Sequence, residues 1–206
     1  MSQQVVINKE IQLYQEVSRK IELKKVWTAL EAQPNPKQLE IIESFDNDES
    51  KNSYVLTIGR RGGKSFQASI IAIRELLIPF SSTVLLCPTY RNAEVLFNAT
   101  LKLVQQLGLP IVKMNRNQFS IELENGAVFA AFSESNIEAA LGRSISLFLV
   151  DEIQSIKNFL HIYESMISAM FLDYGVRESG ILYTNTVIIG TPRGKATEYY
   201  EIYLYE

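Results

Sequence analysis

Apolar and polar positions along this chain follow two different periods, which take turns from one segment to the next. Short apolar runs at 53–59, 82–88 and 146–152 predict buried strands. The runs at 64–78 and 91–108 repeat apolar residues every three or four positions, which predicts amphipathic helices. Strands that alternate with helices are typical of βαβ units built around a parallel sheet.

A β-hairpin interrupts this order at 118–132, where Asn125-Gly126 separates two alternating runs. The wholly apolar stretches 148–150 and 187–189 suit strands in the middle of a sheet that is covered on both faces. The other predicted elements are helices at 136–142, 157–171 and 196–206, a polar loop at 173–180 and a strand at 185–191. We therefore predict an α/β fold with a mostly parallel central sheet, flanking helices and an inserted hairpin.

The N-terminal residues carry a different pattern. Apolar residues recur near the helical period over 8–30, with Lys and Glu between them, which predicts one long or two short amphipathic helices. The prolines of QPNPK end this pattern, and a further helix is expected at 37–45. On this basis we separate an N-terminal helical segment, 1–33, from a core formed by 34–206.

Composition narrows the class of protein. A chain of 206 residues with 47% hydrophobic residues suits one full core, and a net charge of −3 argues against a surface that is basic throughout. The single cysteine, Cys87, excludes an internal disulfide, and the single histidine, His161, argues against a histidine metal site or a Ser-His-Asp triad. The chain starts without a secretory signal pattern and has no apolar run of about 18 residues. We expect a cytosolic protein without membrane contact.

A glycine-rich turn, GRRGGKS, lies between the first predicted strand and the helix at 64–78. Such a turn points backbone N–H groups and the positive end of a helix dipole at one place, which suits an anion. In a P-loop the lysine reaches the β- and γ-phosphates and the next hydroxyl holds Mg²⁺. Lys64 and Ser65 occupy these two positions, and Gly62 and Gly63 let the backbone approach the phosphates.

The turn is a variant of the P-loop pattern. The first glycine of G-x-x-x-x-G-K-[ST] would fall on position 58, where this chain has Ile58, with Gly59 one step later. The alternative interpretation is a glycine-rich turn whose Lys64 is only solvated. The position of the turn, after an apolar strand and before an amphipathic helix, favours the phosphate-binding interpretation.

An NTPase also needs a carboxylate at the end of a neighbouring strand. The apolar run LFLV ends in Asp151 and Glu152, 87 residues after Lys64. We predict that Asp151 binds Mg²⁺ and that Glu152 is the general base for an attacking water. A solvated loop is the alternative for an acidic pair taken by itself.

Four segments together resemble one family. GRRGGKS, CPTYRNAEVL, LGRSISLFLVDE and VIIGTPRG occur in an order and at spacings similar to the ATPase domain of the large terminase subunit, the DNA-packaging motor of tailed bacteriophages and herpesviruses. The resemblance covers about residues 34–195 and rests on the order of the motifs. It implies a P-loop ATPase of the additional-strand, catalytic-glutamate type, often without the first P-loop glycine, that uses ATP and Mg²⁺.

The resemblance also implies roles for residues of the loop and its surroundings. Arg60 corresponds to the family's P-loop arginine, which can neutralise charge during phosphoryl transfer, while Arg61 either shares this role or faces solvent. Gln38 is similar to a glutamine that reads the adenine edge, with Phe45 or Tyr54 as base-stacking or core residues. Adenine is favoured because no guanine-binding Asn-Lys-x-Asp element is present.

Three further positions are implied to act in coupling and assembly. Thr191, which follows Gly190 in the predicted last strand, resembles the family's coupling motif, and a threonine that only caps the next turn is the alternative. Arg143 resembles an arginine that some packaging ATPases insert into the neighbouring subunit's site, with a local salt bridge as the alternative. Arg91 and Lys102 are candidates for contact with DNA phosphates.

The function implied is ATP-driven translocation of double-stranded DNA into a procapsid in the host cytoplasm. The implied partners are the portal protein, the small terminase subunit and further copies in a ring, with a monomer as the alternative in isolation. No second βαβ series with spaced aspartates follows Thr191, so we predict no nuclease in these residues. Two alternatives stay open: a helicase-like or DNA-repair ATPase, and a nucleotide-binding module that hydrolyses nothing.

Overall fold

Seven strands form one sheet in the computed structural model, which describes residues 21–47, 53–171 and 185–191. The strands are β1 (Ser53–Thr57), β2 (Ser82–Cys87), β3 (Ile111–Asn115), β4 (Ser120–Leu123), β5 (Val128–Ser133), β6 (Leu147–Asp151) and β7 (Asn185–Gly190). Their order is β1-β7-β6-β2-β5-β4-β3. Pairing is parallel from β1 to β5 and antiparallel for β4 and β3, which confirms the mostly parallel α/β sheet.

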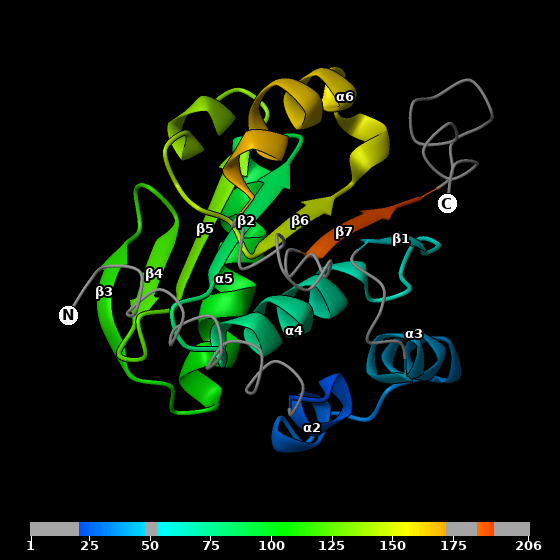
Figure 1. Cartoon of the computed structure of the whole chain (residues 1–206). Coiled ribbons are helices and arrows are strands. Elements are labelled where there is room, and N and C mark those ends of the chain that lie inside the picture. Colours follow the sequence, from blue (N-terminus) through cyan, green and yellow to red (C-terminus); the bar gives the residue numbers. More distant parts are fainter. Residues whose placement is uncertain (1–20, 48–52, 172–184, 192–206) are drawn as a thin grey trace, which may run out of the picture.

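Helices cover both faces of this sheet (Figure 1). The helices are α2 (Leu23–Ala29), α3 (Pro36–Asn47), α4 (Lys64–Leu76), α5 (Tyr90–Gln106) and α6 (Phe159–Ile162). α4 and α5 pack on one face, α2 packs on α3 and α4, and α6 lies with short turns on the other face. None of the helices in the described ranges is both long and apolar enough to cross a lipid bilayer.

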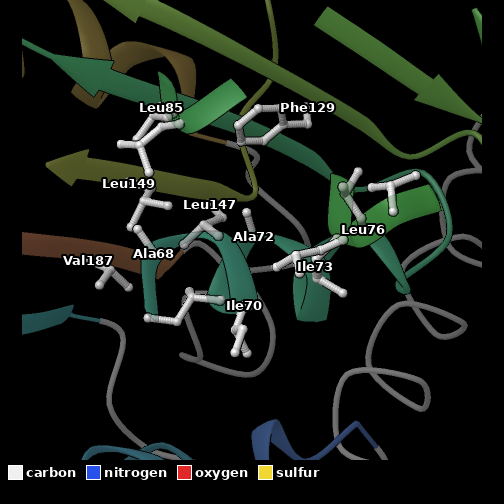
Figure 2. Close-up of a cluster of buried hydrophobic side chains, with 14 of the residues drawn as sticks. Ala68, Ile70, Ala72, Ile73, Leu76, Leu85, Phe129, Leu147, Leu149 and Val187 are labelled. Carbon is white, nitrogen blue, oxygen red and sulfur yellow. The ribbon is translucent and has the colours of Figure 1, made fainter. Parts of the chain in front are cut away.

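The alternation of side chains along the central strands builds two cores. Leu147 and Leu149 of β6 point to the α4 face, where Ala68 and Ala72 meet them (Figure 2). Phe148 of β6 belongs to the second core, on the α6 face. Because successive residues of a strand point to opposite faces, a wholly apolar run needs both faces covered, and this confirms that 148–150 and 187–189 lie in central strands.

The predicted hairpin at Asn125-Gly126 is confirmed, and it is part of the main sheet. β5 pairs with β2 on one side and with β4 on the other, so the second hairpin strand joins the parallel part to the antiparallel edge. β3, at that edge, was not predicted. Val112 and Met114 of this strand are exposed, and without a clear alternation of buried positions the segment carries little strand signal.

Two predicted helices are irregular. The segment 136–142 forms only a short 3-10 turn, Ile137–Ala140. The predicted helix 157–171 breaks after α6 into a π turn, Tyr163–Ile167, and a 3-10 turn, Ser168–Met170. Ser165 and Ser168 donate side-chain hydrogen bonds to backbone carbonyls four residues earlier, a contact that bends helices.

The N-terminal helical prediction for 8–30 is tested only in its second part, where α2 is confirmed. Leu23, Val26 and Trp27 of α2 are buried in the same core as α4. The division at residue 33 stays a prediction. The predictions for residues 8–20, for the loop 173–180 and for the helix 196–206 lie outside the described residues.

Gly126→Ala is expected to destabilise the protein by about 1–3 kcal/mol, because two penalties combine. Gly126 has φ +78°, and a Cβ there would lie 2.7 Å from Cδ1 of the Phe80 ring. Gly108→Ala is the matched control, because Gly108 has φ +65° with nothing within 4 Å of the added Cβ. Urea unfolding of both variants separates the backbone penalty from the steric one. Equal losses of stability would contradict the steric contribution of Phe80.

Candidate nucleotide-binding site

The glycine-rich segment 59–65, called the phosphate loop below, joins β1 to α4 through a tight turn. The backbone N–H of Gly62 donates to the carbonyl of Gly59 at 3.1 Å, and Arg61 and Gly63 both have positive φ, 63° and 81°. Gly63 is the N-cap of α4, and its carbonyl accepts from the Gln67 N–H at 2.9 Å. The first N–H groups of the 13-residue helix therefore lie at this turn, where the helix dipole favours an anion.

Neither of the two central glycines has room for a side chain. A Cβ on Gly62 would lie 2.5 Å from Cγ2 of Ile58, and a Cβ on Gly63 would lie 2.6 Å from Nε2 of Gln38. Ile58, which replaces the first glycine of the common pattern, thus packs directly beneath Gly62. The variant loop keeps bare backbone at the two positions where a phosphate group needs close approach.

Gln38 connects this loop to the start of α3. Its Oε1 accepts from the Asn35 N–H at 3.0 Å while Asn35 Oδ1 accepts from the Gln38 N–H at 3.1 Å, the reciprocal pair of a capping box. The side chain therefore has a structural partner as well as a position beside Gly63. Its role in reading adenine stays a prediction.

Phe45 and Tyr54 stack on each other rather than standing free for a base. Their ring centroids lie 3.9 Å apart at an interplanar angle of 12°, and both side chains are buried in the core. Of the two alternatives for these aromatics, the structure supports the core.

Lys64 and Thr191 meet at the carboxyl edge of the sheet. Lys64 Nζ donates to Thr191 Oγ1 at 2.8 Å and lies 3.5 Å from the carbonyl oxygens of Ile58 and Gly59. Thr191 Oγ1 in turn donates to the Ile58 carbonyl at 3.1 Å. The residue that follows β7 is thus bonded to both ends of the phosphate loop.

Asp151 ends β6 at the same edge, but β6 is not the direct neighbour of β1. The prediction of a neighbouring strand was wrong, because β7 pairs with both and lies between them. The register aligns Leu56 of β1 with Ile189 of β7, and Ile189 with Asp151. Two strand spacings separate the two strand ends, about 10 Å.

The Asp151 carboxyl is buried and incompletely paired. The residue is 4% exposed, and its Oδ1 has no hydrogen-bond partner within the described ranges. Burial, and secondarily the negative charge of Glu152, raise the pKa of Asp151 from 3.8 to about 6, while the backbone N–H of Glu152 and the charge of Lys64 act in the opposite direction. Because the charge of Lys64 acts on the pKa of Asp151, the loop and the end of β6 are close enough to interact electrostatically.

Glu152 has a left-handed backbone, with φ 53° and ψ 44°. A non-glycine residue in this region costs about 1–3 kcal/mol and is kept only where its surroundings require it. The following 3-10 turn, Ile153–Ser155, begins with a bond from the Ser155 N–H to the Glu152 carbonyl at 2.8 Å. Gln154 Oε1 in this turn accepts from the Thr191 N–H at 2.9 Å. Sequence reasoning missed Gln154, whose only signal was its place two residues after Glu152.

The arginines differ in their surroundings. Arg60 and Arg61 are exposed on the loop, and no ion pair of either occurs in the part of the chain that the structure describes. Arg143 lies away from the loop, with its guanidinium carbon 5.7 Å from the centroid of the Phe132 ring, a cation–π contact. The predicted roles of these three arginines stay predictions.

The residues present fit a magnesium nucleotide. The bare glycine backbone suits phosphate oxygens, and the unpaired Asp151 oxygen together with the exposed Ser65 hydroxyl supplies the oxygen ligands that Mg²⁺ prefers. Within the described residues, no group of three or more His, Cys, Asp and Glu side chains forms a metal cage.

A mostly parallel sheet with a glycine-rich loop between β1 and α4 is the fold of a P-loop NTPase. Residues 55–203 match the family described as terminase large subunit, T4likevirus-type, N-terminal. The chain belongs to this family.

Comparison with individual proteins agrees with the family. The chain is 30% identical over 119 residues to the large terminase subunit of Escherichia phage T5, which covers 58% of this chain and 27% of that protein. The Thermus phage P74-26 large terminase ATPase domain has a similar structure, with a TM-score of 0.69 and 22% identity over 86% of this chain and 72% of that one. The N-terminal domain of the DNA packaging ATPase of bacteriophage phi29 has a TM-score of 0.57 and 14% identity, over 82% and 84% of the two chains.

Gly62→Ala is expected to cost about 1–3 kcal/mol of stability, because its Cβ meets Ile58 Cγ2, and to cost less in an Ile58→Ala background. A double-mutant cycle by urea unfolding measures this coupling. Gly59→Ala is the control, because its added Cβ has nothing within 4 Å. Equal costs of Gly62→Ala in the two backgrounds would show that Ile58 does not set the requirement for glycine.

Asp151→Asn is expected to stabilise the metal-free protein at pH 7.5 more than at pH 4.5. The folded-state pKa of about 6 lies above the ordinary 3.8, so unfolding releases a proton between these values and stability falls as pH rises through that window. The full rise in the pKa of Asp151 corresponds to a loss of about 3 kcal/mol in the free energy of unfolding. An Asn side chain does not ionise and avoids this loss. Urea unfolding at both pH values tests this, with the exposed Glu138→Gln as control. A pH-independent difference between wild type and Asp151→Asn would contradict it.

Proposed function

We propose that this chain hydrolyses ATP with Mg²⁺ and uses the energy to move double-stranded DNA into a procapsid. The observation that carries the proposal is that the Lys64–Thr191 hydrogen bond and the Asp151 carboxyl lie at one edge of the sheet, where the charge of Lys64 acts on Asp151. The T5 relative is a large terminase subunit and the phi29 neighbour is a DNA packaging ATPase. The matched region spans about a quarter of the T5 protein, so the activity of a whole terminase is part of the proposal.

Binding of the nucleotide would use the loop and its surroundings. The ammonium of Lys64, the guanidinium of Arg60 and the amides of residues 59–65 would hold the triphosphate, with Arg61 beside them. Ser65 and Asp151 would hold Mg²⁺, which neutralises phosphate charge during transfer. Gln38 would add an adenine contact. A solved large terminase from a thermophilic bacteriophage, similar in fold at a TM-score of 0.57, contains ATP-gamma-S, which supports a nucleotide at this fold.

Hydrolysis would depend on Glu152. Its carboxylate, next to the buried Asp151, would orient a water and take its proton. The contacts of the Lys64 ammonium support a change on binding, because an ammonium that turns to the phosphates gives up some of its present contacts to Thr191 and to the Ile58 and Gly59 carbonyls. Thr191 would therefore move when a nucleotide binds to the loop, and this movement would reach the turn that carries Glu152.

Assembly would complete the motor. The portal protein, the small terminase subunit and DNA are the proposed partners, in a ring on the procapsid. Arg143 would act on the neighbouring subunit after leaving the Phe132 ring, and Arg91 and Lys102, both exposed on α5, would contact DNA phosphates.

Glu152→Gln is expected to lower the ATP turnover number by about 100-fold or more, because the amide cannot accept a proton, while nucleotide binding persists. Turnover is measured with and without Mg²⁺, in the presence of DNA, portal protein and procapsids, with the exposed Glu94→Gln as control. Similar near-zero rates in wild type and Glu152→Gln would favour a passive nucleotide-binding module. DNA-stimulated turnover without any response to portal protein, and without packaged DNA, would favour a helicase-like ATPase.

Nucleotide binding is expected to change the fluorescence of Trp27, the single tryptophan of the chain. Its ring lies edge-on to Phe66, with centroids 5.2 Å apart, and Phe66 follows Lys64 and Ser65 in the first turn of α4. Titration with ATP-gamma-S and Mg²⁺ gives the dissociation constant. Lys64→Ala should abolish this fluorescence change. A fluorescence change in Lys64→Ala as large as that in wild type would mean that the nucleotide binds elsewhere.

A further inference from the structure

Gln154 joins two segments that are 37 residues apart in the sequence. It belongs to the turn Ile153–Ser155 after β6, and its Oε1 accepts the backbone N–H of Thr191, after β7, at 2.9 Å. Both segments lie at the carboxyl edge of the sheet, where β6 and β7 end as parallel neighbours. The bond uses a backbone donor, so it holds the end of β7 independently of the Thr191 side chain.

Thr191 is held from two sides. On the loop side, its hydroxyl accepts from Lys64 and donates to the Ile58 carbonyl. On the acidic side, its N–H donates to Gln154. A displacement of Thr191 that follows a change at Lys64 therefore pulls on Gln154.

Gln154 and Glu152 share one tight turn. The Ser155 N–H bonds to the Glu152 carbonyl, and the Ile156 N–H bonds to the Ile153 carbonyl at 3.0 Å, so the turn moves as a unit. The left-handed backbone of Glu152 persists only if contacts beyond the residue itself require it. The bond from Gln154 to the end of β7 is such a contact.

We propose that Gln154 is a positioning residue for Glu152. It ties the turn that carries Glu152 to the end of β7, so that the state of the Lys64–Thr191 contact sets the direction of the glutamate carboxylate. The inference rests on the proposed ATPase function, and Gln154 acts through Glu152 and Thr191 rather than on the reacting atoms.

Gln154→Met keeps the length of the side chain and removes the acceptor. It is expected to lower the turnover number about 10- to 100-fold, with KM and the dissociation constant from Trp27 fluorescence unchanged within about twofold. Gln154→Glu, which restores an acceptor for the Thr191 N–H, should recover most of the lost turnover. Gln105→Met, on the exposed side of α5, is the matched control. No recovery in Gln154→Glu, or an equal loss in Gln105→Met, would overturn the proposal.

A double mutant tests whether Gln154 acts through Glu152. In a Glu152→Gln background there is no carboxylate left to direct, so Gln154→Met should lower the residual turnover no further. An additional 10-fold loss in that background would mean that Gln154 acts by another route, and would overturn the positioning role.

Hydrogen exchange gives a readout that needs no activity. The Thr191 amide should exchange at least about fivefold faster in Gln154→Met than in wild type, without nucleotide, because its acceptor is gone. Suppose that the wild-type protein turns over ATP. If Gln154→Met then leaves either the exchange rate of the Thr191 amide or the turnover number unchanged, the positioning role of Gln154 is overturned while the proposed function stands. Absence of wild-type turnover with all assembly partners present would overturn the proposed function instead.

Discussion

The pairing of β7 with β1 on one side and β6 on the other is the constraint on which the site depends. The register Leu56–Ile189–Asp151 brings the ends of three strands to one level, and the glycine-rich loop, Thr191 and the turn that carries Glu152 follow these ends. A slip of one residue would turn each side chain of β7 to the opposite face, so the two cores enforce this register. The geometry of the site is thus a consequence of how the apolar faces of β6 and β7 are buried.

The site lowers the stability of the fold that carries it. Burial of the Asp151 carboxyl with an unpaired oxygen costs about 3 kcal/mol at neutral pH, and the left-handed Glu152 adds about 1–3 kcal/mol. The central strands, buried on both faces, offset these costs. Backbone strain and a buried, incompletely paired carboxyl on adjacent residues are common at functional sites.

The chain shares its architecture with ATPase domains that differ widely in sequence, such as the phi29 domain at 14% identity. In this chain the loop has Ile58 at the first glycine position of the common P-loop pattern, and Ile58 packs under Gly62. The loop is connected to the turn that carries Glu152 through the side chain of Lys64, both the hydroxyl and the backbone N–H of Thr191, and the side chain of Gln154. Backbone contacts tolerate substitution better than side-chain pairs, because every residue except proline supplies the same N–H.

The sequence by itself determined the alternation of the parallel strands with α4 and α5, the hairpin at Asn125-Gly126, the glycine-rich turn before α4 and the acidic pair at the end of β6, because apolar periodicity and glycine-rich turns are local signals. It also pointed to the family through the order of its motifs. Only the tertiary structure decided that β7 lies between β1 and β6, that β3 extends the sheet, that Phe45 stacks on Tyr54, and that Gln154 meets Thr191. These depend on which distant segments pair. The free energy of such pairing comes from burial across the whole sheet, so no pattern within a few residues of sequence shows which segments pair.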